Sequence, residues 1–133
     1  MKNLGPTLLL LAAFATSAWL RAAEPKEPAP KDFAIKGELE EGKRIYATYC
    51  KKCHGEKGNG QGLMAKDLDP KPADFTNADK MSEVSDWELF VGVRDGGPPV
   101  GKSDKMTPNK DVLSEQEMHD VIVYVKTFWE KSE

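Results

Sequence analysis

The chain has 133 residues, a formal net charge of −3 and two cysteines. Residues 1–23 contain two basic residues and no acidic ones, so the rest of the chain carries −5. That remainder is long enough for one small domain. Its acidic balance argues against binding to nucleic acid or to anionic membranes.

Residues 1–23 are typical of a secretory signal peptide. Lys2 supplies a positive charge, and an apolar run follows at residues 8–15. Two stretches that end in alanine, Thr16-Ser17-Ala18 and Leu20-Arg21-Ala22, offer cleavage sites, and neither is an ideal one. The apolar run is short compared with the roughly 20 residues of a membrane-spanning helix. We therefore favour a cleaved signal over an uncleaved N-terminal anchor, and we expect the protein to be exported.

Residues 24–36 are predicted to be a linker ahead of a domain at residues 37–131. Residues 24–32 contain three prolines and no large apolar residue. Such a composition favours an extended or disordered chain over a packed element.

An amphipathic helix is predicted over residues 39–49, because apolar residues and one glycine recur there at three- and four-residue steps. It runs directly into the string Cys50-Lys51-Lys52-Cys53-His54, and the glycines that follow should end it. Gly42 inside this helix costs about 1 kcal/mol relative to alanine. A close approach of another helix would explain its presence, and the alternative is a tolerated surface glycine.

The C-x-x-C-H string is a c-type haem attachment motif. Thiols three residues apart on a helical turn lie on one face, where both can bond to the vinyl groups of one porphyrin. His54 then becomes the proximal iron ligand. A thioredoxin-like dithiol would need an alternating strand–helix pattern, and a zinc site would need two more ligands at finger spacing. The sequence has neither, because the remaining histidine, His119, stands alone.

Short helices separated by loops are predicted for the rest of the domain. Residues 58–62 form a glycine-rich loop, and Pro70 and Pro72 enforce an extended chain soon afterwards. Capping boxes at residues 85–88 and 114–117 open two more helices, and the second of these has the longest apolar stripe. No strand pattern of any length is present. The fold is therefore predicted to be all-α, with three to five short helices.

Several pieces of the chain beyond the attachment string have counterparts in one known family. These pieces are Gly58-Asn59-Gly60-Gln61-Gly62, Pro70-Lys71-Pro72-Ala73-Asp74-Phe75, Met106-Thr107-Pro108, and Leu113-Ser114 with Glu117 before a helix that carries Tyr124. Over about residues 37–131 the chain resembles the class I monohaem c-type cytochromes. The resemblance implies a cytochrome c-like fold, with its helices around one haem c attached through Cys50 and Cys53. It also implies that haem is attached outside the cytoplasm, and hence a periplasmic location in a bacterium.

The resemblance implies further details of packing and ligation. The first and last helices should cross near Gly42, with Tyr124 or Phe128 beside it. A backbone carbonyl of Pro70 or of a neighbouring residue should accept the Nδ1–H of His54, which fixes the tautomer of this ligand.

The sixth iron ligand has five candidates in the sequence, which are Met64, Met81, Met106, Met118 and His119. Met106 lies in a polar loop with Pro108 two residues on, where core filling is the weakest explanation for a methionine. In the resembling family the distal methionine directly precedes a proline, whereas here Thr107 intervenes. Met106 is the predicted ligand. His119 lies one step off the apolar stripe of the last helix, which is typical of a solvated surface residue.

The predicted function is that of a periplasmic electron carrier and not of an enzyme. Coordination of the iron by both His54 and Met106 raises the reduction potential and blocks the binding of small molecules to the iron. Such a protein passes single electrons between redox partner proteins. The alternative is a haem sensor or haem enzyme with an open sixth position that binds a gas or a peroxide.

Charge is unevenly distributed along the domain. Residues 50–72 and 102–110 each carry +2, whereas residues 73–101 and 111–133 each carry −4. The two basic segments contain His54 and Met106, so a basic rim around the haem is predicted. A rim of this kind would steer a redox partner with an acidic docking face. The alternative is that these lysines are ordinary solvated surface.

Overall fold

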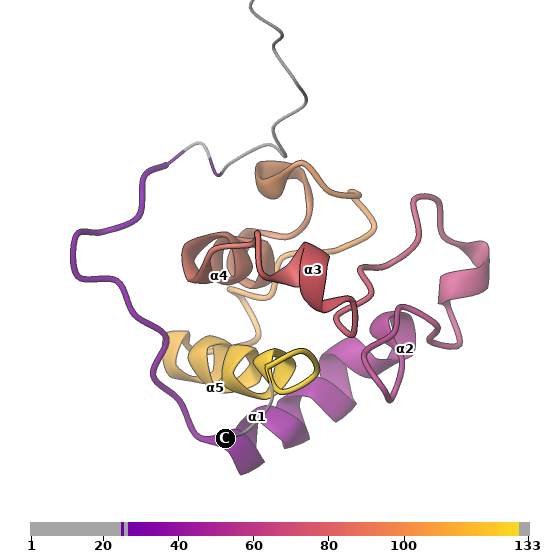
Figure 1. Ribbon diagram of the computed structural model, residues 1–133, viewed down its shortest axis with the longest axis horizontal. Helices are drawn as coiled ribbons and strands as arrows, with labels where there is room; N and C mark the ends of the chain where they lie inside the picture. The colour runs from indigo at the N-terminus through magenta and orange to yellow at the C-terminus, as the bar shows by residue number, and fades with distance from the viewer. Residues whose placement is uncertain (1–24, 26, 131–133) are drawn as a thin grey trace, which may run out of the picture.

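This computed structural model describes residues 25 and 27–130. The predicted signal peptide at residues 1–23 lies outside the described residues. Figure 1 shows helices joined by long loops, with the first and last helices crossing at one end of the domain.

Five α-helices and three short helical turns make up the described chain. The α-helices are α1 (Leu39–Ile45), α2 (Lys51–His54), α3 (Ala78–Met81), α4 (Asp86–Asp95) and α5 (Glu115–Lys126). The π-helical turn is η1 (Tyr46–Cys50), and the 3₁₀ turns are η2 (Ala65–Asp67) and η3 (Pro98–Val100). No strand occurs in residues 25 and 27–130. The all-α prediction is therefore confirmed.

α1, η1 and α2 follow one another without a break, as predicted for the helix that enters the attachment string. The Thr48 hydroxyl donates to the Arg44 carbonyl at 3.0 Å, a side-chain bond that competes with the regular helical ladder and accompanies the wider π turn. The helix ends at Gly55, whose φ of +85° glycine adopts without strain. His54 is consequently the last helical residue before the loop.

Gly42 lies where α1 crosses α5. A Cβ atom at this position would stand 1.9 Å from the Asp120 carbonyl oxygen and 3.0 Å from the Tyr124 Cβ. The two backbones therefore approach each other more closely than any side chain at Gly42 would allow. This confirms that Gly42 serves a helix crossing, and that Tyr124 is the aromatic residue beside it.

Asp120 of α5 also holds the start of α1. Its side chain is only 4% exposed, and it accepts hydrogen bonds from the Glu38 backbone N–H at 2.7 Å and the Gln116 amide at 2.9 Å. Glu38 is the N-cap residue of α1, and its own side chain makes no capping bond. The first turn of α1 is thus capped by a residue that lies 82 positions later in the chain.

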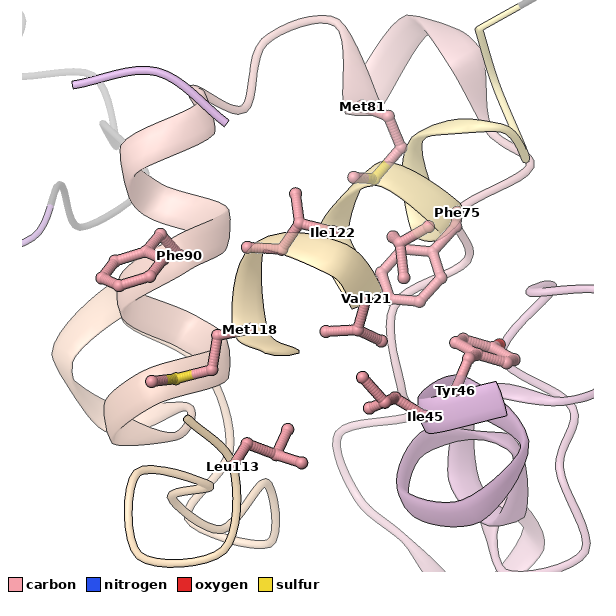
Figure 2. Packing of buried hydrophobic residues seen from close by; sticks show 10 residues of the cluster. Ile45, Tyr46, Phe75, Met81, Phe90, Leu113, Met118, Val121 and Ile122 are labelled. Carbon is pink, nitrogen blue, oxygen red and sulfur yellow. The ribbon is translucent and has the colours of Figure 1, made fainter. Parts of the chain in front are cut away.

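The hydrophobic core fills the space between α1, α4 and α5, and Figure 2 shows α5 passing between the other two. α5 begins with a complete capping box, in which Ser114 and Glu117 satisfy each other's backbone N–H groups. The core cluster consists of Ile45, Tyr46, Phe75, Met81, Phe90, Leu113, Met118, Val121, Ile122 and Val125.

The segment predicted to be a linker contacts the domain. In Figure 1 it runs along the outside of the molecule from α4 towards α1. The Phe33 ring lies 4.8 Å from Trp87 and 5.2 Å from Phe90, and the Trp87 indole donates to the Glu27 carbonyl at 3.0 Å. The prediction that residues 24–32 form no packed element is therefore wrong at Glu27, and Phe33, in the rest of the predicted linker, also packs on α4. Both residues contact aromatic side chains of α4. The proline-rich composition of the segment gives no sign of these partners.

No helix within the described part of the chain is long and apolar enough to cross a membrane.

Candidate haem attachment site

Cys50 and Cys53 lie on consecutive turns at the end of the first helical segment. Cys50 closes η1 and Cys53 lies within α2, and both thiols are free and partly buried. Burial raises the pKa of the Cys50 thiol to about 12, and the neighbouring Cys53 adds to this effect. The two cysteines are three residues apart in a continuous helical segment, which is the spacing that the motif requires.

His54 is oriented by the backbone of a later loop. Its Nδ1 lies 3.2 Å from the Ala73 carbonyl oxygen. An N–H donated from Nδ1 leaves the Nε2 lone pair available to a metal. Burial lowers the pKa of His54, although the Ala73 bond opposes this effect. The neutral imidazole, which is the form that binds iron, is therefore favoured.

The carbonyl beside His54 belongs to Ala73, three residues beyond Pro70. The sequence indicated the right loop, because Ala73 lies within the proline-containing piece, but the pattern did not indicate which carbonyl turns inward. Phe75, in the same piece, stacks on the imidazole with ring centroids 4.5 Å apart and planes 14° apart. Nothing in the sequence pattern predicted this contact.

Tyr46 ties the helix to the residue that follows His54. Its hydroxyl donates to the Gly55 carbonyl at 2.7 Å, within the interior, and the side chain is only 2% exposed. Tyr46 is one of the apolar residues that recur in the helix predicted over residues 39–49, and that pattern did not reveal this role. The signal was available, because a tyrosine at a core position usually finds a partner for its hydroxyl.

Met106 lies in the loop between η3 and α5, and this loop is fastened to the end of α4. The Met106 carbonyl accepts the Gly97 N–H at 2.9 Å, and its own N–H donates to Ser103 at 3.2 Å. The Asn109 side chain donates to the Val93 carbonyl at 2.9 Å. The Met106 side chain is partly buried.

The other methionine candidates have different surroundings. Met81 and Met118 are 6% and 5% exposed and belong to the hydrophobic core, and Figure 2 shows both sulfur atoms among the core side chains. Met64, by contrast, is 51% exposed on the surface. Core filling accounts for Met81 and Met118, and it accounts for neither Met64 nor Met106.

His119 is not the solvated surface residue that its place in the sequence indicated. Its ring lies 5.1 Å from Phe90 and 5.7 Å from Phe33. Within the described residues its Nδ1 is buried without a hydrogen-bond partner. The segment that carries Phe33 covers this part of α5, which explains the difference from the sequence prediction.

The residues at the attachment string suit a covalently bound haem. Two free thiols lie three residues apart in one helical segment, and the adjacent imidazole has its Nδ1 engaged, which leaves Nε2 available to a metal. Groups of three or more His, Cys, Asp or Glu side chains that could hold a bare metal ion are absent from the described part of the chain. The two thiols and the single imidazole at the attachment string fit a metal whose remaining ligands come from a porphyrin.

Comparisons with known proteins agree with this arrangement. The family model for cytochrome c matches residues 39–129. Cytochrome c-554(547) of Halothiobacillus neapolitanus is 31% identical over 96 residues, which cover 68% of this chain and 97% of that protein.

Solved structures give the same result. The structure of a reducing HAO-like protein complex of Kuenenia stuttgartiensis, Kustc0457/Kustc0458, aligns with a TM-score of 0.58 and 30% identity over 72% of this chain. The alignment spans less than half, 45%, of that protein chain. The c-type cytochrome KustC0563 aligns with a TM-score of 0.54 and 27% identity, over 67% of this chain and 98% of its own. The chain therefore belongs to the cytochrome c family, whose members transfer electrons and bind haem c covalently at a C-x-x-C-H motif such as the one formed here by Cys50, Cys53 and His54.

Proposed function

We propose that this protein is an exported monohaem electron carrier without enzymatic activity. Cys50 and Cys53 form the thioether bonds, and His54 and Met106 are the axial ligands. The observation that carries the proposal is the His54 imidazole, which is held at Nδ1 by the Ala73 carbonyl beside two free thiols.

Each residue has a defined task in this proposal. The haem, when bound, supplies a one-electron iron couple. The Ala73 carbonyl keeps the proton of His54 on Nδ1, which strengthens Nε2 as a ligand. Met106 contributes a soft thioether, which stabilises Fe(II) over Fe(III) and raises the potential. With His54 and Met106 holding it, the haem iron would gain and lose an electron without exchange of ligands.

The surroundings of the methionines support Met106 as the distal ligand. Met81 and Met118 are committed to the core, and α5 carries His119 against Phe33 and Phe90. Met106 lies on a loop held by backbone hydrogen bonds, and the three rotatable bonds of its side chain let the sulfur reach a metal.

The distal ligand is tested by Met106→Ala. This variant should lose the weak charge-transfer absorption of a methionine–Fe(III) bond, and its reduction potential should fall. Met64→Ala is the matched control, because Met64 is exposed, and it should keep both properties. An unchanged spectrum for Met106→Ala would show that another residue is the distal ligand. A high-spin spectrum of the wild-type protein would instead favour a haem sensor or haem enzyme with an open site.

Covalent attachment is tested by the double variant Cys50→Ala, Cys53→Ala. Haem that survives denaturing electrophoresis should disappear in this variant. Haem staining that persists would contradict the assignment of the two thiols.

We also propose that residues 1–23 direct export and are then removed, which gives a periplasmic protein in a bacterium. Support comes from Lys2 and the apolar run that follows it. Cell fractionation with mass determination of the mature chain tests the proposal. A full-length chain that sediments with membranes would show an uncleaved anchor.

The docking surface in this proposal is the basic side of the attachment site. Lys51 and Lys52 are exposed on α2, and the backbone N–H of Met64 donates to the Lys52 carbonyl at 2.9 Å. Leu63 and Met64, 87% and 51% exposed, thus lie next to these lysines. An apolar contact beside positive charge suits a redox partner with an acidic face.

Charge steering is measured through oxidation of the ferrous protein by hexacyanoferrate(III), an anionic reagent. The rate should fall as ionic strength rises, and the reversals Lys51→Glu, Lys52→Glu and Lys105→Glu should flatten this dependence. Lys43→Glu, on an exposed part of α1 outside the basic segments, is the control. A rate independent of salt would contradict the basic rim and leave the haem assignment intact.

A further inference from the structure

Three aromatic rings from distant parts of the chain lie nearly parallel behind the attachment string. The His54 and Phe75 planes differ by 14°, with centroids 4.5 Å apart. The Phe75 and Phe128 planes differ by 15°, with centroids 6.3 Å apart. The row thus extends from the proposed iron ligand, through the loop after the attachment string, to the chain just beyond α5.

A single glycine, Gly58, lies against both Phe75 and Phe128. The Gly58 carbonyl accepts the Phe75 backbone N–H at 2.7 Å. A Cβ atom at Gly58 would lie 2.6 Å from Cδ2 of Phe128, and its φ of +68° also favours glycine. The Phe128 ring packs in addition on Tyr46 and Tyr124, both with centroids 5.3 Å away.

The imidazole of His54 is restrained in two independent ways. The Ala73 carbonyl fixes the position of Nδ1, but a single hydrogen bond leaves the ring free to tilt about the line that joins the two atoms. The Phe75 ring covers one face of the imidazole and opposes this tilt. Phe75 is itself only 9% exposed and has Phe128 behind it, so it cannot easily move away.

We propose that Phe75 is a positioning residue that, supported by Phe128, sets the plane of the His54 imidazole. This inference rests on the proposed function, because it requires His54 to be an axial ligand. The orientation of an axial imidazole determines how its π orbitals overlap with the iron d orbitals, and hence how unpaired spin spreads over the ferric porphyrin. Phe75 thereby tunes the electronic structure of the haem without binding the iron.

The test compares Phe75→Leu with Phe75→Tyr in the haem-loaded protein. Leucine is apolar but has no ring plane, whereas tyrosine keeps the ring. Phe75→Leu should change the spread of the haem-methyl proton shifts and the anisotropy of the ferric electron paramagnetic resonance signal. Phe75→Tyr should restore both to the wild-type pattern. Phe128→Leu should shift them in the same direction as Phe75→Leu, and by less.

Phe90→Leu is the matched control. Phe90 is a core phenylalanine, 4% exposed, whose ring contacts are Phe33, Trp87 and His119. This variant should lose stability as Phe75→Leu does, while it keeps the wild-type spectra. Equal spectral changes in Phe90→Leu and Phe75→Leu, or none in Phe75→Leu, would overturn the proposal. If Phe75→Leu does not retain haem, the Phe128→Leu spectra replace it in this comparison. Unchanged spectra in Phe128→Leu, or changes equal to those of Phe90→Leu, would then overturn the proposal.

The outcomes separate this inference from the function on which it rests. Wild-type spectra without histidine ligation would contradict the proposed function itself. Wild-type spectra of a low-spin, histidine-ligated haem that Phe75→Leu leaves unchanged would contradict the positioning role alone.

Discussion

The two sides of the proposed haem site are held in different ways. On the attachment side, side chains restrain the ligand and its neighbour. Phe75 stacks on the His54 ring, and the Tyr46 hydroxyl bonds to the Gly55 carbonyl. On the Met106 side, Met106 itself is held through its backbone, by hydrogen bonds to Gly97 and Ser103.

The two sides therefore differ in how tightly the side chain of the proposed ligand is held. The geometry around His54 depends on aromatic packing against Phe75, which belongs to the core. The Met106 loop has its path fixed by backbone bonds, whereas the flexible thioether can adjust its position. Substitutions on the two sides should therefore produce different spectroscopic and thermodynamic effects.

Gly42→Ala should have the largest effect, because it moves the helix that carries the attachment string. The new methyl group would meet the Asp120 backbone, which cannot rotate away. We expect a loss of roughly 3 kcal/mol or more in the free energy of unfolding, measured with denaturant. Lys43→Ala, at the exposed neighbouring position, should change it by less than about 0.5 kcal/mol. A Gly42→Ala protein of wild-type stability would contradict the close helix crossing.

Gly96→Ala should disturb the Met106 side selectively. Gly96 has a φ of +84°, and a Cβ there would lie 2.5 Å from the Met106 carbonyl oxygen. We expect a loss of about 1–3 kcal/mol and a weaker methionine–Fe(III) band, with the covalent haem retained. Gly101→Ala is the control, because Gly101 also has a positive φ of +68°. If both variants weaken the band equally, strain and not the displacement of Met106 is responsible.

Tyr46→Phe should disturb the attachment side selectively and by less. It leaves the buried Gly55 carbonyl without its donor, which costs about 1–2 kcal/mol. The methionine–Fe(III) band should stay as it is in the wild type. Tyr49→Phe, at a position 46% exposed, should be close to neutral. A weakened band in Tyr46→Phe would show that the two sides are not independent.

The smallest expected effect is a pH dependence at the end of α4, next to the Met106 loop. Hydrogen bonding to Arg94 lowers the pKa of Asp95 below its ordinary value of 3.8, and Lys110 of the loop contributes. The ionised form is thus favoured in the folded state. The stability it provides is present above about pH 3.8 and is lost as the pH falls through the folded-state pKa.

This dependence is measured as denaturant midpoints between neutral and acid pH. Asp95→Asn should remove part of the loss of stability in acid. Asp111→Asn, at an exposed position, is the control and should follow the wild-type curve. An identical acid profile for Asp95→Asn would show that the pair with Arg94 contributes nothing measurable.

Sequence patterns predicted what depends on neighbouring residues. The attachment string lies within five residues, and the capping box of α5 within four, so local chemistry defines both. The crossing at Gly42 was also predictable, because a glycine inside a helix needs a packing reason. α3 was not foreseen, since its four residues, capped by Asn77, are too short for any periodicity.

What remained hidden depends on the path of the chain through space. Which carbonyl meets His54 depends on how the loop turns, so Ala73 could not be distinguished from Pro70. Phe33 is a lone aromatic residue after a proline-rich stretch, and its partners on α4 lie more than 50 residues away. His119 was wrongly predicted to be a solvated surface residue, because the sequence did not show that the segment carrying Phe33 covers it.

The cap that Asp120 provides for α1 has a consequence for how the domain could be divided. A fragment ending after the attachment string would contain the helix-forming residues of α1, yet it would lack the carboxylate that receives the Glu38 N–H. It would also lack the backbone surface that fits Gly42. A second fragment containing α5 would supply both together. The start of α1 in the haem-bearing half is therefore stabilised by contacts that the other half supplies.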